Sequence, residues 1–266
     1  MSRALSPTVG LLAWTVFQAT FYHGLLALDP AYQLIINRRR RNRDEVQAMQ
    51  RLVPAAQQRV VDSRALHALD GQYDVLVFQS PFPGIHRFEK TRLVSLQYGL
   101  AKEPHNYGAW RAFGDLALCM GPYSVDRIAP FCPAISVGNL SFETYTAQKD
   151  ALKDACLGRL TPFLPGRKTV LYAPTWGDLS SLDLYAKAVA GLQDTCNLVV
   201  KLHHNTYLLE AGRLHAVQSI MPMAAQAQGC DLHALIDLAD LVISDYSGAI
   251  FDAVLHNKAL MLLNIP

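Results

Sequence analysis

Three short polar segments, each directly after an apolar run, carry the residues best suited to chemistry. One of them reads Ser244-Asp245-Tyr246-Ser247-Gly248. Ser247 can cap a following helix, whose first N–H groups carry the positive end of the helix dipole, and Gly248 lets a ligand approach the main chain. The segment therefore suits a phosphate, although a plain helix cap at Ser247 and a plain turn residue at Asp245 would explain it equally well.

The other two segments are Pro174-Thr175-Trp176-Gly177-Asp178 and Lys201-Leu202-His203-His204. In the first, the Thr175 hydroxyl and the Trp176 ring suit a phosphate or a base, and the same residues also form a good turn. In the second, strand alternation predicts that Lys201 and His203 share one side while His204 lies opposite. One histidine is then expected at a crevice, as a base when neutral or an electrostatic clamp when protonated.

Several other kinds of site are excluded by the residue spacing. No group of His, Asp or Glu has metal-ligand spacing, and neither a Gly-x-Gly-x-x-Gly nor a P-loop pattern is present. We therefore expect no metal and no cofactor, and neither a nicotinamide-dependent dehydrogenase nor a P-loop NTPase. The five cysteines are odd in number and form no CxxC pair, which predicts buried thiols rather than disulfides or zinc ligands.

Composition indicates a folded protein of two domains. The chain has 266 residues, of which 51% are hydrophobic and 17% charged, and this excludes disorder. The most apolar stretch, residues 9–28, is interrupted by Gln18, His23 and Gly24, so no membrane-spanning helix is expected. The first residues do not resemble a secretory signal, which predicts a cytoplasmic protein.

A basic run stands out although the net charge is only +2. It consists of Arg38, Arg39, Arg40, Arg41 and Arg43. Such a run attracts phosphates or the anionic inner face of a membrane, and a solvated loop is an equally good interpretation. Because no basic stripe continues after Arg127, no nucleic-acid partner is expected.

Apolar runs alternate with segments of helical period, which predicts parallel sheets covered on both faces. In a first series we expect a helix from Phe17 to Leu28, ended by Asp29-Pro30. The strands expected there are Val9–Trp14, Gln33–Asn37, Tyr73–Gln79, Arg92–Gln97, Leu116–Met120 and Ala134–Val137.

A second series follows a polar helical stretch that ends at Pro165-Gly166. Its expected strands are Thr169–Ala173, Asn197–Leu202, Val217–Met221, Leu241–Ser244 and Ala259–Leu263. Its expected helices lie near 182–192, 207–216, 231–239 and 248–256. We therefore predict an α/β protein with Rossmann-like domains at 1–145 and 169–266 and a linker at 146–168. In such sheets ligands bind beyond the carboxyl ends of the strands, where all three polar segments fall.

The order of these segments resembles the CDP-glycerol glycerophosphotransferase family of teichoic acid and capsule biosynthesis. The resemblance rests on the Pro-Thr-Trp turn, the Lys-x-His segment and the Asp-Tyr-Ser loop, and more weakly on residues 95–102 of the first domain. It implies the glycosyltransferase B architecture, two Rossmann-like domains facing across a cleft. The chain ends at Pro266 directly after a strand, so the second domain is expected to be shorter at its C-terminal end than in relatives.

Residue roles follow from the resemblance. His203 matches a histidine near the donor pyrophosphate, while Thr175, Trp176, Lys201, Asp245, Tyr246, Ser247 and Gly248 match donor-binding positions. Gln97, Tyr98, Gly99 and Lys102 match the acceptor-side loop. Where the family has His-Gly this sequence has Tyr98-Gly99, and His105 is the nearest replacement for the missing base.

The resemblance implies a transferase that moves glycerol phosphate, or a related polyol phosphate, from a CDP-activated donor to an acceptor hydroxyl and releases CMP. Its implied partners are CDP-glycerol or a similar CDP-polyol, a lipid-linked glycopolymer and an anionic membrane surface on which the protein would be peripheral. Two alternatives remain: a nucleotide-sugar glycosyltransferase or epimerase of the same fold, and an accessory protein that binds nucleotide without turnover.

Overall fold

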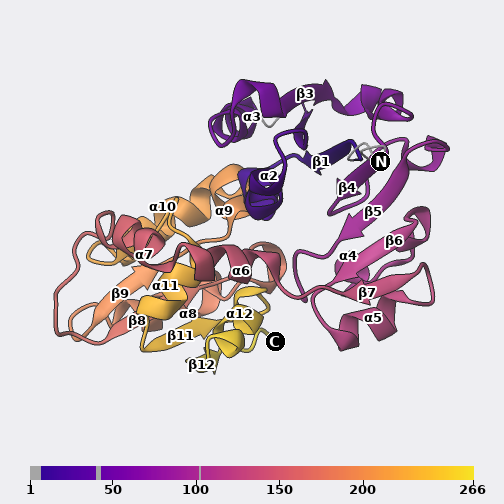
Figure 1. The fold of residues 1–266 in the computed structure, drawn as a ribbon. Coiled ribbons are helices and arrows are strands. Elements are labelled where there is room, and N and C mark those ends of the chain that lie inside the picture. The colour runs from indigo at the N-terminus through magenta and orange to yellow at the C-terminus, as the bar shows by residue number, and fades with distance from the viewer. Residues whose placement is uncertain (1–6, 40–42, 102) are drawn as a thin grey trace. The chain divides into compact units, whose positions relative to one another are not determined.

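The chain divides into two compact units, Met1–Thr144 and Tyr145–Pro266, and the boundary falls inside helix α6 (Leu140–Ala147) (Figure 1). The structure is a computed structural model that describes residues 7–39, 43–101 and 103–266. Each unit contains one parallel sheet, so the predicted α/β class with two Rossmann-like sheets is confirmed.

The first unit is built on a seven-stranded parallel sheet with the order β3-β2-β1-β4-β5-β6-β7. Its strands are β1 (Val9–Ala13), β2 (Gln33–Arg38), β3 (Gln58–Asp62), β4 (Val75–Phe78), β5 (Arg92–Leu96), β6 (Leu116–Cys119) and β7 (Ala134–Ser136). Its α-helices, besides the start of α6, are α1 (Val16–Thr20), α2 (His23–Leu28), α3 (Arg43–Gln50), α4 (Glu103–Asn106) and α5 (Pro122–Ile128). Short 3-10 turns are η1 (Ala55–Gln57), η2 (Ser63–Leu69), η3 (Ile85–Arg87) and η4 (Ala109–Phe113).

Both faces of this sheet are covered, which explains why its central strands are apolar at consecutive positions. Leu11 and Leu34 point to one face, where they pack with side chains of α1, α2 and α3. Leu12 and Ile35, the next residue in each strand, point to the other face and pack against η2 and η3. All four side chains are buried.

The second unit has a five-stranded parallel sheet with the order β10-β9-β8-β11-β12. Its strands are β8 (Thr169–Ala173), β9 (Asn197–Val200), β10 (Ala225–Gln226), β11 (Leu241–Ser244) and β12 (Ala259–Leu262). Its helices are α7 (Lys149–Leu157), α8 (Leu182–Ala190), α9 (His204–Leu209), α10 (Ala211–Ile220), α11 (Leu232–Leu238) and α12 (Ala249–Leu255), with the 3-10 turn η5 (Gly177–Leu179). Helices α8, α9 and α10 pack together, and α11 packs against α7 and α12.

Each sheet reverses its strand order once, and this reversal determines where a ligand can bind. The order runs outward from β1 and from β8, so the reversals lie between β1 and β4 and between β8 and β11. In open parallel sheets the loops at the carboxyl ends of the two strands beside a reversal diverge and leave a binding crevice. The reversal of the second sheet thus separates the Thr175 turn from the Asp245 loop.

All but one of the expected strands are confirmed, and one further strand is present. Val217–Met221 was expected to be a strand, but residues 217–220 belong to helix α10 and Met221 is its C-cap. The third strand of the second unit is the two-residue β10. Strand β3 at the edge of the first sheet was not expected at all. The single helix expected from Phe17 to Leu28 is divided into α1 and α2.

The stretch expected to be a linker contains α7, which packs on α11 of the second unit. Asp237 on α11 accepts a hydrogen bond from the Tyr145 hydroxyl at 2.9 Å and forms ion pairs with Lys149 and Lys153. Burial would raise the pKa of Asp237, but hydrogen bonds from the two lysines and Tyr145 hold it below its usual range. These contacts tie α6 and α7 to the second unit.

Among the residues that the structure describes, no helix is long and apolar enough to cross a membrane. All five cysteines are buried free thiols, as expected from their number and spacing.

Candidate functional site

The two loops beside the reversal of the second sheet are joined by Asp245. This residue follows β11 and is only 4% exposed. Its Oδ1 accepts the main-chain N–H of Thr175 and its Oδ2 that of Ser181, each at 2.8 Å. Just before it, the Ser244 hydroxyl donates to the Ala173 carbonyl at 2.6 Å. The Asp245 carboxylate therefore positions the Thr175 turn, and both of its oxygens are already engaged by the protein.

A second acidic residue, Glu210, fixes the far side of the same turn. Glu210 Oε1 accepts the Gly177 N–H at 3.1 Å and pairs with Arg213 at 2.6 Å, and the Arg213 guanidinium donates to the Gly177 carbonyl at 2.8 Å. Both polar main-chain groups of Gly177 are thus held by one ion pair. Gly177 has φ +72°, a conformation that glycine adopts without cost. Glu210 and Arg213 were not identified from the sequence.

His203 lies beside this turn at the carboxyl end of β9, the neighbour of β8. It is the N-cap of α9, and its Nδ1 accepts the Asn205 N–H at 3.2 Å. Its ring stacks on Trp176 with a centroid distance of 6.0 Å and on His204 at 4.1 Å. The predicted proximity of the Thr-Trp turn and the Lys-x-His segment is therefore present.

The cap hydrogen bond also sets the tautomer of His203. Because Nδ1 accepts a main-chain N–H, the proton of the neutral ring is on Nε2. An Nε2–H group next to an aromatic ring can donate to a phosphate oxygen. In this tautomer Nε2 cannot accept a proton, so the geometry favours an electrophilic role over that of a base.

The expectation that Lys201 and His203 share one strand side is wrong, because β9 already ends at Val200. The Lys201 ammonium donates to the carbonyls of Ala227 and Cys230, at 3.3 and 2.8 Å, on the β10 side. Burial lowers its pKa. His203 stacks instead on Trp176 from β8, so the structure does not bring the Lys201 ammonium to this histidine.

The Asp-Tyr-Ser loop differs from the expected helix cap. The N-cap of α12 is Gly248, and Ser247 Oγ accepts the Ala249 N–H at 3.3 Å. Gly248 has an ordinary φ of −58°, and a Cβ added there would meet no atom within 4 Å. The fold therefore does not require glycine at this position, whereas a close ligand would. Tyr246 is exposed and donates to Asn264 Oδ1.

In the first unit, the predicted acceptor-side residues follow β5. Gln97 is buried; its Oε1 accepts the Met120 N–H at 2.9 Å and its Nε2 donates to the Gly99 carbonyl. The Tyr98 ring makes an edge contact with the ring of exposed His105 at 6.1 Å. Burial raises the pKa of Tyr98 to about 12, so its phenol stays protonated and does not replace a base. Lys102 lies outside the described residues.

Arg111 is a fully buried guanidinium that sequence reasoning missed. It donates to Ser95 Oγ at 2.9 Å and to the Asn106 carbonyl at 3.0 Å, and it stacks on Trp110. Burial lowers its pKa to about 10. Arg111 therefore links the end of β5 to the segment that carries His105.

The described arginines of the basic run lie at the carboxyl end of β2 and the start of α3. Arg38, Arg39 and Arg43 are exposed, whereas Arg40 and Arg41 lie outside the described residues. Arg39 stacks on the Trp14 ring, with 3.6 Å between its Cζ and the ring centroid. The run thus begins at the same edge of the sheet as the Gln97 loop.

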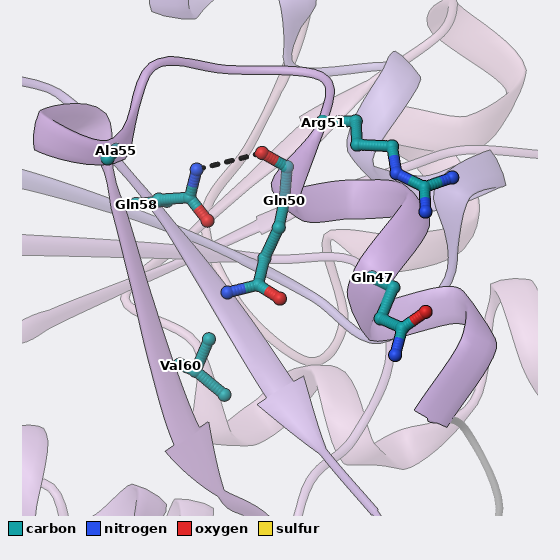
Figure 2. Close-up of a pocket in the computed structure, with 6 residues that line it drawn as sticks. All are labelled: Gln47, Gln50, Arg51, Ala55, Gln58 and Val60. Carbon is teal, nitrogen blue, oxygen red and sulfur yellow. Dashed lines mark hydrogen bonds between the residues drawn. The ribbon is translucent and has the colours of Figure 1, made fainter.

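A hollow of about 560 Å³ lies elsewhere in the first unit (Figure 2). It is lined by Gln47, Gln50, Arg51, Ala55, Gln58 and Val60, and Gln58 Nε2 donates to the Gln50 carbonyl at 2.9 Å. The hollow opens between α3 and the amino end of β3, opposite the strand ends that carry the predicted residues. It contains no acid, base or nucleophile, so we do not assign it as the site. In the described part of the chain, no three His, Cys, Asp or Glu residues are grouped to hold a metal ion.

Solved structures with the same fold extend over nearly the whole chain. The wall teichoic acid polymerase TagF is similar with a TM-score of 0.64 at 16% identity, covering 96% of this chain and 70% of that one. The S. aureus MnaA–UDP co-structure gives 0.67 at 13%, covering 98% and 80%. The UDP-GlcNAc 2-epimerase from Neisseria meningitidis bound to UDP-GlcNAc gives 0.58 at 13%, covering 96% and 82%. The chain is therefore an α/β protein with two Rossmann-like domains of the glycosyltransferase B type.

The family match is confined to the second unit. Residues 144–262 match the model of the CDP-Glycerol:Poly(glycerophosphate) glycerophosphotransferase family. The resemblance stated from the sequence is thereby confirmed. No curated protein sequence gave a significant match.

Proposed function

We propose that the protein transfers glycerol phosphate, or a related polyol phosphate, from a CDP-activated donor to an acceptor hydroxyl of a cell-wall or capsule glycopolymer and releases CMP. The observation that carries this proposal is the Trp176–His203 stack at the adjacent carboxyl ends of β8 and β9. It lies within the segment that matches the glycerophosphotransferase family. Open parallel sheets bind nucleotides at this edge, beside the strand-order reversal.

In the proposed reaction the acceptor hydroxyl attacks the glycerol-bearing phosphorus. A new P–O bond forms, the bond to the CMP oxygen breaks, and the hydroxyl proton passes to a base. Such transfers depend mainly on positioning and on stabilising charge that develops on the phosphate oxygens. We assign the second of these tasks to His203, whose Nε2 carries the proton of the neutral ring.

The Asp245 and Glu210 contacts would supply the positioning. They hold main-chain atoms of the Thr175–Gly177 turn, so this turn is fixed before a ligand arrives. Prior fixation lowers the entropy that is lost when a reactant is oriented. On the acceptor side, exposed His105 is the proposed base, because Tyr98 stays protonated.

The test is the release of CMP from CDP-glycerol by the wild type and by His203→Ala. We expect a loss of at least 100-fold for His203→Ala, the range seen when one group that stabilises transition-state charge is removed. His215→Ala is the matched control, because His215 is an exposed histidine of the same unit on α10. Wild-type turnover by His203→Ala would exclude the proposed role of His203.

The likeness to the MnaA–UDP co-structure and to a UDP-GlcNAc 2-epimerase bound to UDP-GlcNAc supports a second candidate, an epimerase or glycosyltransferase acting on a nucleotide sugar. A donor panel of CDP-glycerol, CDP-ribitol and UDP-GlcNAc separates the candidates. Release of CMP from a CDP-polyol supports the glycerophosphotransferase. Conversion of UDP-GlcNAc supports the second candidate, and binding without turnover of any donor supports an accessory protein.

A further inference from the structure

The carboxyl edge of the first sheet, where β2 and β1 end side by side, has a composition that no proposed role yet uses. Arg39 is the residue after β2, and Trp14 is the residue after β1. The Arg39 guanidinium lies over the Trp14 ring at 3.6 Å. Arg38, the last residue of β2, and Arg43, the first residue of α3, are both exposed.

Two acidic groups near these arginines have other partners, and one of them, Asp62, also interacts electrostatically with Arg38. Glu45 on α3 accepts the Val16 N–H through Oε2 at 2.6 Å, and Asp62, opposite Arg38 in the β2–β3 register, pairs with Arg64 at 3.3 Å. Asp44 is exposed. Burial lowers the pKa of Arg39, as expected for a guanidinium partly removed from water, yet an arginine remains charged at neutral pH. The edge therefore presents oriented positive charge.

The strand on the other side of the reversal contributes a buried polar group. Gln79, the residue after β4, is 1% exposed, and its Nε2 donates to the Gln18 carbonyl at 3.0 Å. Its Oε1 has no hydrogen-bond partner among the described residues. A buried acceptor without a donor is costly, and a hydroxyl from a ligand or a water would satisfy it.

We propose that Arg38, Arg39 and Arg43 form a binding site for the phosphates of a phosphodiester-linked polyol chain, the acceptor of the reaction, with Gln79 at its inner end. This inference rests on the proposed function for the identity of the acceptor. A guanidinium can donate two parallel hydrogen bonds to one phosphate. Stacking on Trp14 already restricts the Arg39 side chain, so less conformational entropy is lost when a phosphate binds. Two adjacent arginines and a third at the start of α3 suit a polymer that carries one phosphate per repeat.

A membrane surface is the other anion that the basic run could bind. Attraction to anionic lipid depends on charge near the surface and is nearly the same for lysine and arginine. Here one guanidinium is stacked and aligned at the edge of the sheet where ligands of such folds bind. This geometry favours a ligand that is recognised by shape as well as charge.

The experiment measures the dissociation constant of a synthetic glycerol phosphate oligomer. We expect Arg39→Ala to weaken binding about tenfold, the effect of losing one charge-assisted contact, and Arg39→Lys to weaken it nearly as much although it keeps the charge. Arg51→Ala is the matched control, because Arg51 is an exposed arginine of the same unit at the hollow of Figure 2. Circular dichroism checks that each variant is folded.

Equal losses for Arg51→Ala and Arg39→Ala would overturn the site in favour of diffuse charge attraction. Loss of binding to phosphatidylglycerol vesicles with unchanged oligomer binding would overturn it in favour of a membrane surface. CMP release from CDP-glycerol is measured separately. Its absence with every variant and with the wild type would contradict the proposed function, while the oligomer affinities would still decide whether the arginine site exists.

Discussion

The carboxyl edges of the two sheets are built by different interactions. In the second unit, Asp245 and Glu210 bind main-chain groups of the Thr175–Gly177 turn through their carboxylates. In the first unit, ring contacts add to one bond of this kind, from the Val16 N–H to Glu45: Tyr98 meets Phe17, Phe21 and His105, and Trp14 meets Arg39.

This difference shows two ways of preparing a binding edge. Hydrogen bonds from main-chain N–H groups to a buried carboxylate have strict geometry, so they fix a loop in one conformation. Ring contacts accept a range of angles and leave polar groups at the surface. Under the proposed function, the first design would suit a donor whose reacting phosphorus must be placed accurately, and the second an acceptor that offers many equivalent repeats.

The largest effect is expected from Asp245→Ala. It leaves the buried N–H groups of Thr175 and Ser181 without an acceptor, at a cost of about 4 kcal/mol in the free energy of unfolding of the second unit. Urea denaturation measures this loss. Asp178→Ala, an exposed carboxylate on the same turn, is the control and should be neutral. If Asp245→Ala were as stable as the wild type, the carboxylate hydrogen bonds would not distinguish the second edge from the first.

Arg111→Ala tests whether the stability of the first unit depends on packing or on specific hydrogen bonds, as that of the second unit depends on the hydrogen bonds of Asp245. Removing the buried guanidinium leaves Ser95 and the Asn106 carbonyl unpaired and opens a cavity, and we expect a loss of about 3 kcal/mol. Arg111→Met fills much of the volume without burying a charge and should be clearly more stable than Arg111→Ala. If Met were as harmful as Ala, specific hydrogen bonds would support this unit as well.

A pH effect of roughly the same size is expected in the second unit. His233 is buried, with its Nδ1 at 3.2 Å from His256 Nε2. Burial and His256 lower its pKa to about 4, against about 6.5 in an unfolded chain. The unfolded state therefore binds more protons between these values, so the contribution is complete above about pH 6.5 and falls by roughly 3 kcal/mol as the pH drops to about 4.

Urea denaturation at about pH 7 and about pH 4.5 measures this dependence. His233→Gln should lose much of the pH dependence in this window, whereas His215→Gln, which changes an exposed histidine, should keep it. Equal pH dependence of wild type and His233→Gln would assign the effect to other groups.

The smallest effects are expected at two glycines on the carboxyl edge of the second sheet. A Cβ would meet no atom at Gly177 or Gly248, but only Gly177 has a positive φ. Gly177→Ala should therefore cost about 1 kcal/mol, and Gly248→Ala should leave stability unchanged. If Gly248→Ala nevertheless weakens CDP-glycerol binding, a ligand approaches the main chain at that position. Unchanged binding would remove Gly248 from the donor site.

The central strands could be predicted because both faces of each sheet are buried, which makes their sequences continuously apolar. Strand β3 was not predicted because Gln58–Asp62 is a half-buried, largely polar edge strand. Val217–Met221 was wrong because Leu214, Val217 and Met221 have helical spacing and face the core from α10.

The site was only partly predictable, for a different reason. The positions of Thr175, Trp176 and His203 follow from the rule that the carboxyl ends of parallel strands meet at one edge. Glu210 lies 33 residues from its partner Gly177, and Arg111 lies 16 residues from Ser95. No local sequence pattern therefore predicts either contact. Lys201 was placed incorrectly because the strand was assumed to continue past Val200.

The stack of Trp176 on His203 gives this protein a built-in optical probe. The chain has three tryptophans, and the other two, Trp14 and Trp110, belong to the first unit. Indole emission depends on what the ring touches, so an anion drawn to His203 is expected to change the fluorescence of Trp176. In a Trp14→Phe, Trp110→Phe background that keeps its fold, titration with unlabelled nucleotides would report directly whether this edge is occupied.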